Sequence, residues 1–159
     1  MHARCHIRPM RQGDMDAILH VEHASFGSDA YDRKLFAGYS RACEGLFLVA
    51  ESAGRVCGYS VTRARGNRAE LVSIAVDPPA RRKGVASALL ASTLRRLRRR
   101  NVECLSLMVR LANAGARGFY EKYEFTQVRI VRKYYEDGSD GGLMQRTICG
   151  ARAGLRQRI

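Results

Sequence analysis

No part of this sequence is long and apolar enough to span a membrane. The longest apolar run, from Leu46 to Ala50, is far shorter than the ~20 residues that a membrane-spanning helix needs. No basic-then-apolar leader precedes the first predicted element, so we expect no export signal. A hydrophobic fraction of 46% beside 27% charged residues is typical of a soluble globular protein. Together these features favour a cytoplasmic location.

The sequence also lacks any cysteine or histidine pattern that would hold a metal ion or a set of disulfides. Its five cysteines are scattered and never form C-x-x-C, and its four histidines form no ligand cluster. The cysteines are Cys5, Cys43, Cys57, Cys104 and Cys149. We therefore predict no metal site, and we expect free thiols buried as small side chains in a reducing compartment.

Acidic residues are scarce, with 15 Asp and Glu against 28 Lys and Arg and a net charge of +13 at pH 7. Such a charge attracts polyanions, including RNA and the ribosome, and disfavours the capture of polyamines. Eight basic residues fall between positions 81 and 100, with no acid among them. Two interpretations stay open for those at positions 95–100. They form either a solvated helix end, whose positive charges interact favourably with the negative end of the helix dipole, or a patch that faces RNA or the ribosome.

The chain is organised around the stretch from Glu70 to Leu97, which is predicted to form a strand, a short loop and a helix. Positions 71–76 are apolar or small on both alternating faces, as in a strand buried on both sides. Two prolines end the strand, and apolar residues recur at helical spacing from Val85 onward. The basic loop therefore precedes a helix N-terminus, which suits an anionic phosphate, although a solvated surface turn is the alternative. Neither G-x-x-x-x-G-K-[ST] nor G-x-G-x-x-G occurs.

The loop carries Arg-x-x-Gly-x-Ala at positions 81–86, which resembles the [Q/R]-x-x-G-x-[G/A] signature of the GNAT family of N-acetyltransferases. With Ile-Ala-Val-Asp-Pro at positions 74–78, and with Asn113 and Tyr120, the sequence is most similar to the RimI-like branch of that family. This branch acetylates protein N-termini, typically of a ribosomal protein. The resemblance extends to about Cys149 and implies acetyl-CoA as the cofactor.

The predicted elements indicate an α/β fold with a mixed, mostly antiparallel twisted sheet and helices on both faces. Strands are predicted at 6–10, 45–51, 56–62, 70–76, 102–109, 126–135 and 143–149, and helices at 15–26, 32–39, 85–97 and 113–123. Asp14 is predicted to cap the first helix, and the second is predicted to end near Gly38. The order matches the acyl-CoA N-acyltransferase (GNAT) fold, in which the fourth and fifth strands splay apart. We expect a single domain over residues 1–149 and a basic tail over 150–159.

The resemblance implies which residues bind the cofactor. They are Ile74, Ala75, Val76, Arg81, Arg82, Lys83, Gly84, Val85, Ala86, Ser87 and Asn113. The amides of residues 82–87 are expected to face the diphosphate, and the side chains of Arg81, Arg82 and Lys83 to meet its charge. Gly84 is expected to let the backbone approach the cofactor closely. Asn113 is alternatively a helix cap only, and the two roles can coexist.

The resemblance also assigns the proton transfers. Tyr120, two helical turns after Asn113, is expected to protonate the departing CoA sulfur; the alternative is a core aromatic. The branch usually carries a glutamate where this sequence has Met108, which cannot accept a proton. Glu70 is the expected substitute base, unless it is only a surface carboxylate, and Glu22 or a water relay also stays open.

The expected acceptor is a primary amine, most readily the α-amine of a protein or peptide N-terminus. By the resemblance, Phe26 and Tyr31 shape the acceptor side, and Tyr134 and Tyr135 echo a tyrosine pair that contacts the acceptor peptide. Transfer is expected to be direct, because no cysteine lies in a nucleophile setting. Two alternatives remain: an acetyltransferase for a small-molecule amine, and a catalytically degraded module that binds CoA or the ribosome.

Overall fold

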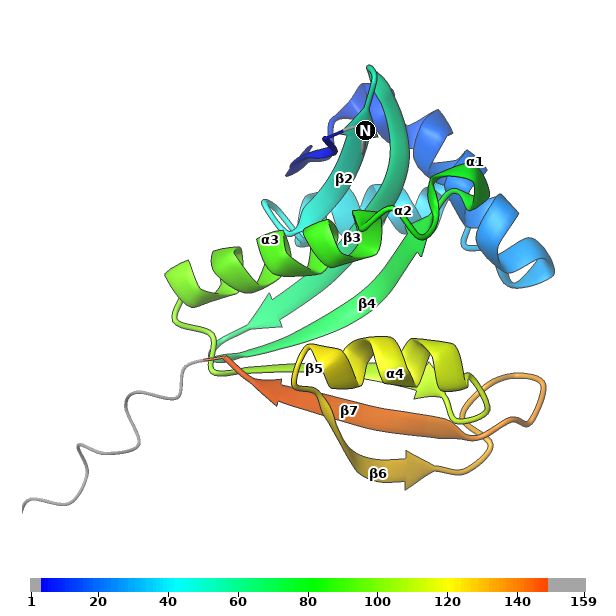
Figure 1. Cartoon of the computed structure of the whole chain (residues 1–159), viewed down its shortest axis with the longest axis vertical. Coiled ribbons are helices and arrows are strands. Elements are labelled where there is room, and N and C mark those ends of the chain that lie inside the picture. The colour runs from blue at the N-terminus through cyan, green and yellow to red at the C-terminus, as the bar shows by residue number, and fades with distance from the viewer. Residues whose placement is uncertain (1–3, 149–159) are drawn as a thin grey trace, which may run out of the picture. The chain divides into compact units, whose positions relative to one another are not determined.

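The computed structural model describes residues 4–148, and its seven strands form one sheet in the order β1-β2-β3-β4-β5-β7-β6 (Figure 1). The strands are β1 (His6–Pro9), β2 (Phe47–Ser52), β3 (Arg55–Arg65), β4 (Arg68–Val76), β5 (Cys104–Arg110), β6 (Thr126–Val131) and β7 (Gly141–Thr147). The α-helices are α1 (Met15–Phe26), α2 (Arg33–Ala42), α3 (Val85–Arg99) and α4 (Ala114–Lys122). Three 3₁₀ turns are η1 (Gln12–Asp14), η2 (Gly27–Asp29) and η3 (Pro78–Ala80). The predicted order of elements is confirmed.

The sheet is mixed, as predicted. β1 pairs antiparallel with β2, β2 with β3, β5 with β7 and β6 with β7, whereas β4 and β5 pair in parallel. The parallel ladder joins Arg68–Glu70 to Cys104–Ser106. The chain divides into two compact units, the first comprising the residues up to Arg63 with Leu71–Arg96, and the second comprising Ala64–Glu70 and the residues from Leu97 on. The splay of the fourth and fifth strands stays a prediction, as does the single domain.

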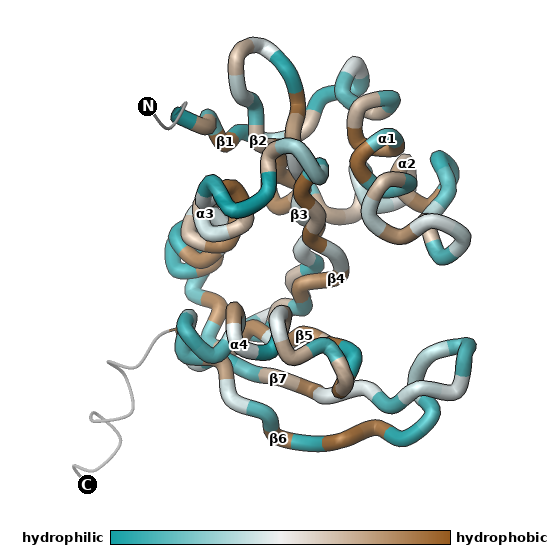
Figure 2. The backbone as a smooth tube through the Cα atoms, turned by 45° about the vertical axis from the view of Figure 1, so that its right-hand side comes forward, coloured by the Kyte–Doolittle hydropathy of each residue, from teal (hydrophilic) through white to brown (hydrophobic). Residues whose placement is uncertain are grey.

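In the first unit, helices cover both faces of the sheet because β2 alternates its side chains between them. Phe47 and Val49 pack in one buried cluster with residues of α1 and α2. Leu48 packs in a second cluster with Val85 and Leu89 of α3. Hydrophilic and hydrophobic residues alternate along α3, as an amphipathic helix requires (Figure 2).

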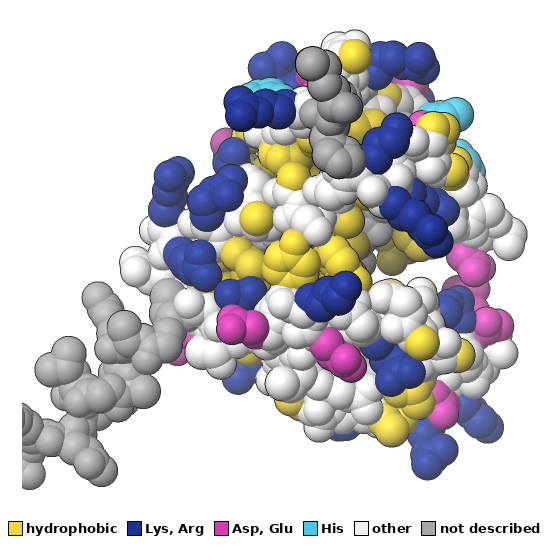
Figure 3. Space-filling view, viewed as in Figure 1, with side chains coloured by type: hydrophobic (Ala, Val, Ile, Leu, Met, Phe, Trp, Pro, Cys, Tyr) yellow, Lys and Arg dark blue, Asp and Glu magenta, His cyan; other side chains and the backbone are white. Residues whose placement is uncertain are grey.

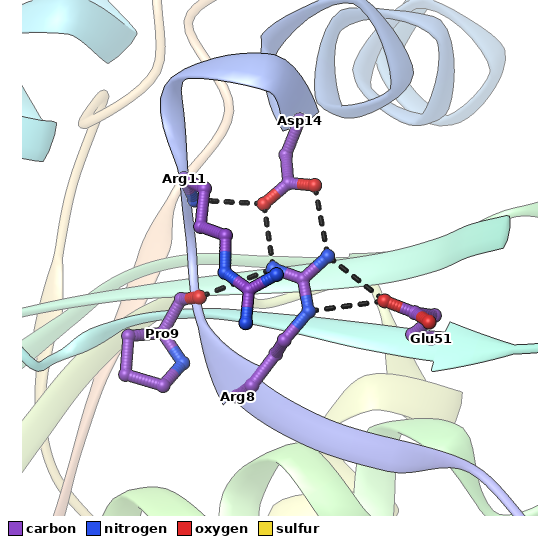
Figure 4. A network of polar contacts seen from close by, with 5 residues as sticks. All are labelled: Arg8, Pro9, Arg11, Asp14 and Glu51. Atoms are coloured by element: carbon purple, nitrogen blue, oxygen red, sulfur yellow. Dashed lines mark hydrogen bonds and ion pairs between the residues drawn. The ribbon is translucent and has the colours of Figure 1, made fainter. Parts of the chain in front are cut away.

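Asp14 does not cap α1 as predicted. Its carboxylate accepts hydrogen bonds from the Arg11 amide at 2.7 Å and from the Arg8 guanidinium at 2.7 and 2.9 Å (Figure 4). Arg8 also donates to Glu51 at 3.0 Å. Asp14 therefore closes η1 and ties it to β1, and the Arg8 guanidinium holds the pKa of this carboxyl below its usual range.

One further boundary and one burial pattern differ from prediction. α2, capped by Asp32, continues through Gly38 to Ala42. β4 is buried at Leu71, Ala75 and Val76 but only half-buried at Val72, Ser73 and Ile74, so its middle is not enclosed on both faces.

In the second unit, β5 lies between β4 and β7, and β6 pairs with β7. The side chain of Asn113 accepts from the Ala116 amide at 3.0 Å, which confirms the predicted cap of α4. β6 ends at Val131 instead of position 135, so Tyr134 and Tyr135 lie in the turn that follows it. The backbone of Lys133 adopts a left-handed φ of +51° and leaves the strand direction there.

Within residues 4–148, no group of three or more His, Cys, Asp or Glu side chains could hold a metal ion, and no helix is long and apolar enough to cross a membrane.

Cys43 is buried, whereas Cys5, Cys57 and Cys104 are only half-buried, and all four thiols are free. Lys and Arg side chains are spread widely over the face in Figure 3. Cys149 and the predicted tail over 150–159 lie outside the described residues.

Candidate active site

The loop between β4 and α3 turns sharply ahead of the helix. After Val76, the backbone of Arg82 and that of Gly84 adopt left-handed φ values of +61° and +82°. α3 begins at Val85, and the Ala88 amide donates to the Gly84 carbonyl at 3.0 Å. The N–H groups of the turn before Ala88 lack intrahelical acceptors, so they are available at the helix end, as an anion site requires.

This loop fits a diphosphate. A Cβ built on Gly84 would meet no protein atom within 4 Å, so the positive φ, more than clearance from the protein, explains the glycine. Arg82 and Lys83 are exposed and carry positive charge beside the free amides. A cavity of about 740 Å³ borders the loop, with Lys83 and Val85 in its lining. Amides and cations therefore converge on the head of α3.

Arg81 makes contacts that the sequence did not predict. Its Nε donates to the Val76 carbonyl at 2.9 Å, and its Nη2 donates to the Ser25 hydroxyl at 3.2 Å. The first signature residue is therefore anchored to the end of β4 and to α1, and only the rest of its guanidinium is left for a phosphate. Ser25 gave no signal in the sequence, because a single serine in a helix is common.

The connection between α1 and α2 surrounds a buried carboxylate. Glu22 is 1% exposed, and it accepts hydrogen bonds from the Tyr31 amide at 2.9 Å and from the Tyr59 hydroxyl. The Tyr59 hydroxyl lies 2.9 Å from that of Ser73 on β4, and burial raises the pKa of Tyr59 above its ordinary value. Phe26 is 41% exposed, which is unusual for a large apolar side chain. Glu22 thus holds this connection in place, a role that makes it a poor candidate for the base.

In the second unit, Tyr120 is buried on α4 in an aromatic cluster. Its ring contacts those of Phe119 and Phe125 edge-on, with centroids 5.3 and 5.6 Å apart. Burial, with a smaller contribution from Tyr135, raises the pKa of Tyr120 to about 12. The phenol is therefore fully protonated at neutral pH, as a proton donor must be.

Tyr134 and Tyr135 form a second aromatic feature of this unit. Their rings meet edge-on at 4.9 Å, and the Arg110 guanidinium lies 4.1 Å from the centre of the Tyr135 ring. Arg110 also pairs with Asp137 at 2.8 Å, and hydrogen bonds from Ser139 and Arg110 lower the pKa of Asp137 to about 2. Asp137, in the turn between β6 and β7, is thus occupied with internal contacts, while Tyr134 is 48% exposed.

The predicted site residues divide between the two units. Phe26, Tyr31 and residues 74–87 belong to the first, whereas Glu70, Asn113, Tyr120, Tyr134 and Tyr135 belong to the second. Glu70 lies opposite Ser106 in the parallel ladder and is half-buried, and Met108 lies opposite Leu143. The base therefore stays a prediction.

The chain is similar to known acetyltransferases along most of its length. The sequence profile of the Acetyltransferase (GNAT) family matches residues 14–125. An N-alpha-acetyltransferase from Sulfurisphaera tokodaii is 32% identical over 151 residues, covering 87% of this chain and 90% of the relative. The [ribosomal protein bS18]-alanine N-acetyltransferase of Escherichia coli is 30% identical over 140 residues, covering 87% and 93%. The crystal structure of Ard1 from Thermoplasma volcanium has a TM-score of 0.87 at 30% identity, covering 91% of this chain and 98% of that one. The chain therefore belongs to the GNAT family of acetyltransferases and is an acyltransferase.

Proposed function

We propose that the protein transfers an acetyl group from acetyl-CoA directly to the α-amine of a protein or peptide N-terminus. The observation that supports acetyl-CoA as the cofactor is the left-handed backbone conformation of Arg82 and Gly84, ahead of α3. Relatives at 30 and 32% identity that are named for N-terminal acetylation support the acceptor. The net charge of +13 suits an acceptor on the ribosome, so we place a ribosomal protein first and the reaction in the cytoplasm.

The residues proposed to hold acetyl-CoA are the strand end Ile74–Val76, the loop and helix head from Arg81 to Ser87, and Asn113. The amides of residues 82–87 bind the diphosphate, and Lys83 adds charge. The bound cofactor supplies an acyl group activated as a thioester. Asn113 already caps α4 through its Oδ1, so its Nδ2 is the atom that remains to donate to the cofactor.

The chain's own residues move two protons. Tyr120 keeps its proton at neutral pH, because burial raises its pKa to about 12, and it delivers this proton to the departing sulfur. Glu70 accepts the proton of the attacking amine through a water molecule. Phe26 and Tyr31 in one unit, and Tyr134 and Tyr135 in the other, supply aromatic surface for the acceptor.

An α-amine suits a site with a weak base. With a pKa of about 7.8, roughly 14% of an α-amine is neutral at pH 7, whereas a lysine with a pKa of about 10.4 is only about 0.04% neutral. Replacement of the usual glutamate by Met108 therefore lowers the rate of acetylation of a lysine far more than that of an N-terminus.

Mass spectrometry of short peptides incubated with acetyl-CoA tests the proposal. Peptides with a free N-terminal alanine, serine or methionine are expected to gain one acetyl group, and the same peptides with a blocked N-terminus and an internal lysine are expected to gain none. Turnover of small amines but not of peptides would overturn the acceptor. A failure to bind acetyl-CoA at micromolar concentration in calorimetry would overturn the reaction itself.

A further inference from the structure

The connection between α1 and α2 is held at both of its ends by side chains of the first unit. At its start, the Ser25 hydroxyl accepts a hydrogen bond from Nη2 of Arg81 at 3.2 Å. At its end, the Tyr31 amide donates to Glu22 at 2.9 Å. Between these anchors lies η2 with the exposed Phe26, and we call residues 26–30 the acceptor loop. The position of the acceptor loop therefore depends on these two anchors.

The two anchors differ in strength. Glu22 is 1% exposed, and Tyr59, which donates to it, is fully buried and also lies 2.9 Å from Ser73. A buried carboxylate cannot give up such donors without a large desolvation penalty, so the anchor at Tyr31 is fixed. The bond between Arg81 and Ser25, at 3.2 Å, is at the long end of the normal range and exposed, so water competes with it and it is the weaker anchor.

Arg81 is itself part of the loop that precedes α3. A guanidinium has five N–H donors in one rigid plane. Arg81 uses Nε on the Val76 carbonyl and Nη2 on Ser25, and no other described residue accepts from it. An anion bound at the remaining donors would fix the plane of the guanidinium, because Val76 already holds its other edge. Fixing that plane also fixes the nitrogen that binds Ser25.

We propose that Arg81 is a positioning residue that couples the two substrates, so that a diphosphate at the head of α3 strengthens the Arg81–Ser25 hydrogen bond and orders the acceptor loop. The acceptor peptide then binds more tightly once CoA is bound. This inference rests on the proposed function, because it takes the diphosphate and the peptide from it. The link lies entirely within the first unit.

Calorimetric titration of one peptide with and without CoA tests the coupling, since CoA carries the diphosphate but cannot transfer an acetyl group. The probe is a short peptide with a free N-terminal alanine. We expect saturating CoA to lower the peptide Kd of the wild-type protein about fivefold or more, within the usual range of coupling between sites. Ser25→Ala is expected to leave CoA affinity unchanged and to reduce the effect to less than about twofold.

Ser28→Ala is the matched control, because Ser28 is an exposed serine of the acceptor loop whose side chain has no hydrogen-bond partner among the described residues. It should retain the wild-type coupling. If Ser25 had a purely structural role, Ser25→Ala would raise the peptide Kd equally with and without CoA. A ratio of these two Kd values equal to that of the wild type would therefore overturn the inference. CoA binding with no effect on the peptide in the wild type would overturn the inference alone, whereas absence of CoA binding would overturn the proposed function with it.

Discussion

The hydroxyl of Tyr59 donates a hydrogen bond to the carboxylate of Glu22, and both side chains are buried in the first unit. The Tyr59 ring meets that of Phe36 edge-on at 5.4 Å, so the phenol has little freedom to turn elsewhere. A carboxylate at this depth is stable only while its donors are present, because burial without partners is costly.

Tyr59→Phe should therefore destabilise the protein. The substitution keeps the ring and its packing but leaves Glu22 with one donor fewer, and we expect the free energy of unfolding to fall by about 1–3 kcal/mol. Urea unfolding followed by circular dichroism measures the change. Tyr134→Phe, which removes a hydroxyl from a side chain that is 48% exposed, should change it by less than about 0.5 kcal/mol. Equal stability of Tyr59→Phe and the wild type would contradict the role of this bond.

The elements that build the fold could be predicted because their signals are local. The periodicity of residues 85–97 predicted α3, and Asn113 predicted the cap of α4, within a few neighbouring residues. The predicted end of a helix was wrong where a local stop signal was too weak to end it. Gly38 weakens a helix by only about 1 kcal/mol, and α2 continues past it.

The contacts that shape the site could not be predicted in this way. Arg81 and Ser25 are 56 positions apart, and Tyr59 and Glu22 are 37 apart. Periodicity shows which face of an element a residue occupies, but not which partner it meets across the core. The proposed role of Arg81 as a phosphate ligand rests on its charge and on the resemblance, whereas its hydrogen bond to Val76 is seen only in the structure.

Tyr120→Phe should lower kcat by about 100-fold or more while leaving the KM for acetyl-CoA nearly unchanged. The phenol is the proposed proton donor, and general acid catalysis contributes typically about 10²–10⁴. Steady-state rates with a peptide acceptor measure the loss. Tyr123→Phe is the control, because Tyr123 lies near the end of the same helix and its ring also contacts Phe119. A kcat equal to that of the wild type would remove Tyr120 from the mechanism.

Glu70→Gln should lower kcat less than Tyr120→Phe when the acceptor is an α-amine. Roughly 14% of such an amine is already neutral at pH 7, so a missing base slows the reaction only moderately. The loss should shrink further between pH 7 and 8.5, as the amine deprotonates without help. A pH profile of kcat/KM measures this, with the exposed Glu121→Gln on α4 as the control. If the loss instead stays constant across that pH range, Glu70 is not acting as the base.

The pKa of Tyr120 also predicts how stability depends on pH. Burial raises the pKa to about 12 from an unfolded value near 10. Below pH 10 the phenol is protonated in both states, so its contribution to stability is complete. Between pH 10 and 12 the unfolded state ionises first, and stability falls by at most about 3 kcal/mol. Tyr120→Phe should flatten this decline, although Tyr59, whose pKa is raised in the same direction, adds to it in both proteins. Unfolding midpoints in urea across this pH range measure the difference, and identical slopes would contradict the burial of the phenol.

Gly84→Ala should raise the KM for acetyl-CoA by about tenfold. The residue has a φ of +82° and open space beside it, so the new methyl group meets no protein atom but strains the backbone. A left-handed non-glycine residue costs roughly 1–2 kcal/mol, and relief of that strain moves the amides away from the diphosphate. Gly138→Ala is a matched control, because Gly138 also has a φ of +82° with no atom within 4 Å, yet it lies in the turn between β6 and β7. Both variants should lose similar stability, whereas only Gly84→Ala should lose affinity for acetyl-CoA. Equal KM values for the two variants would show that the head of α3 does not hold the diphosphate, because strain alone would then account for every change.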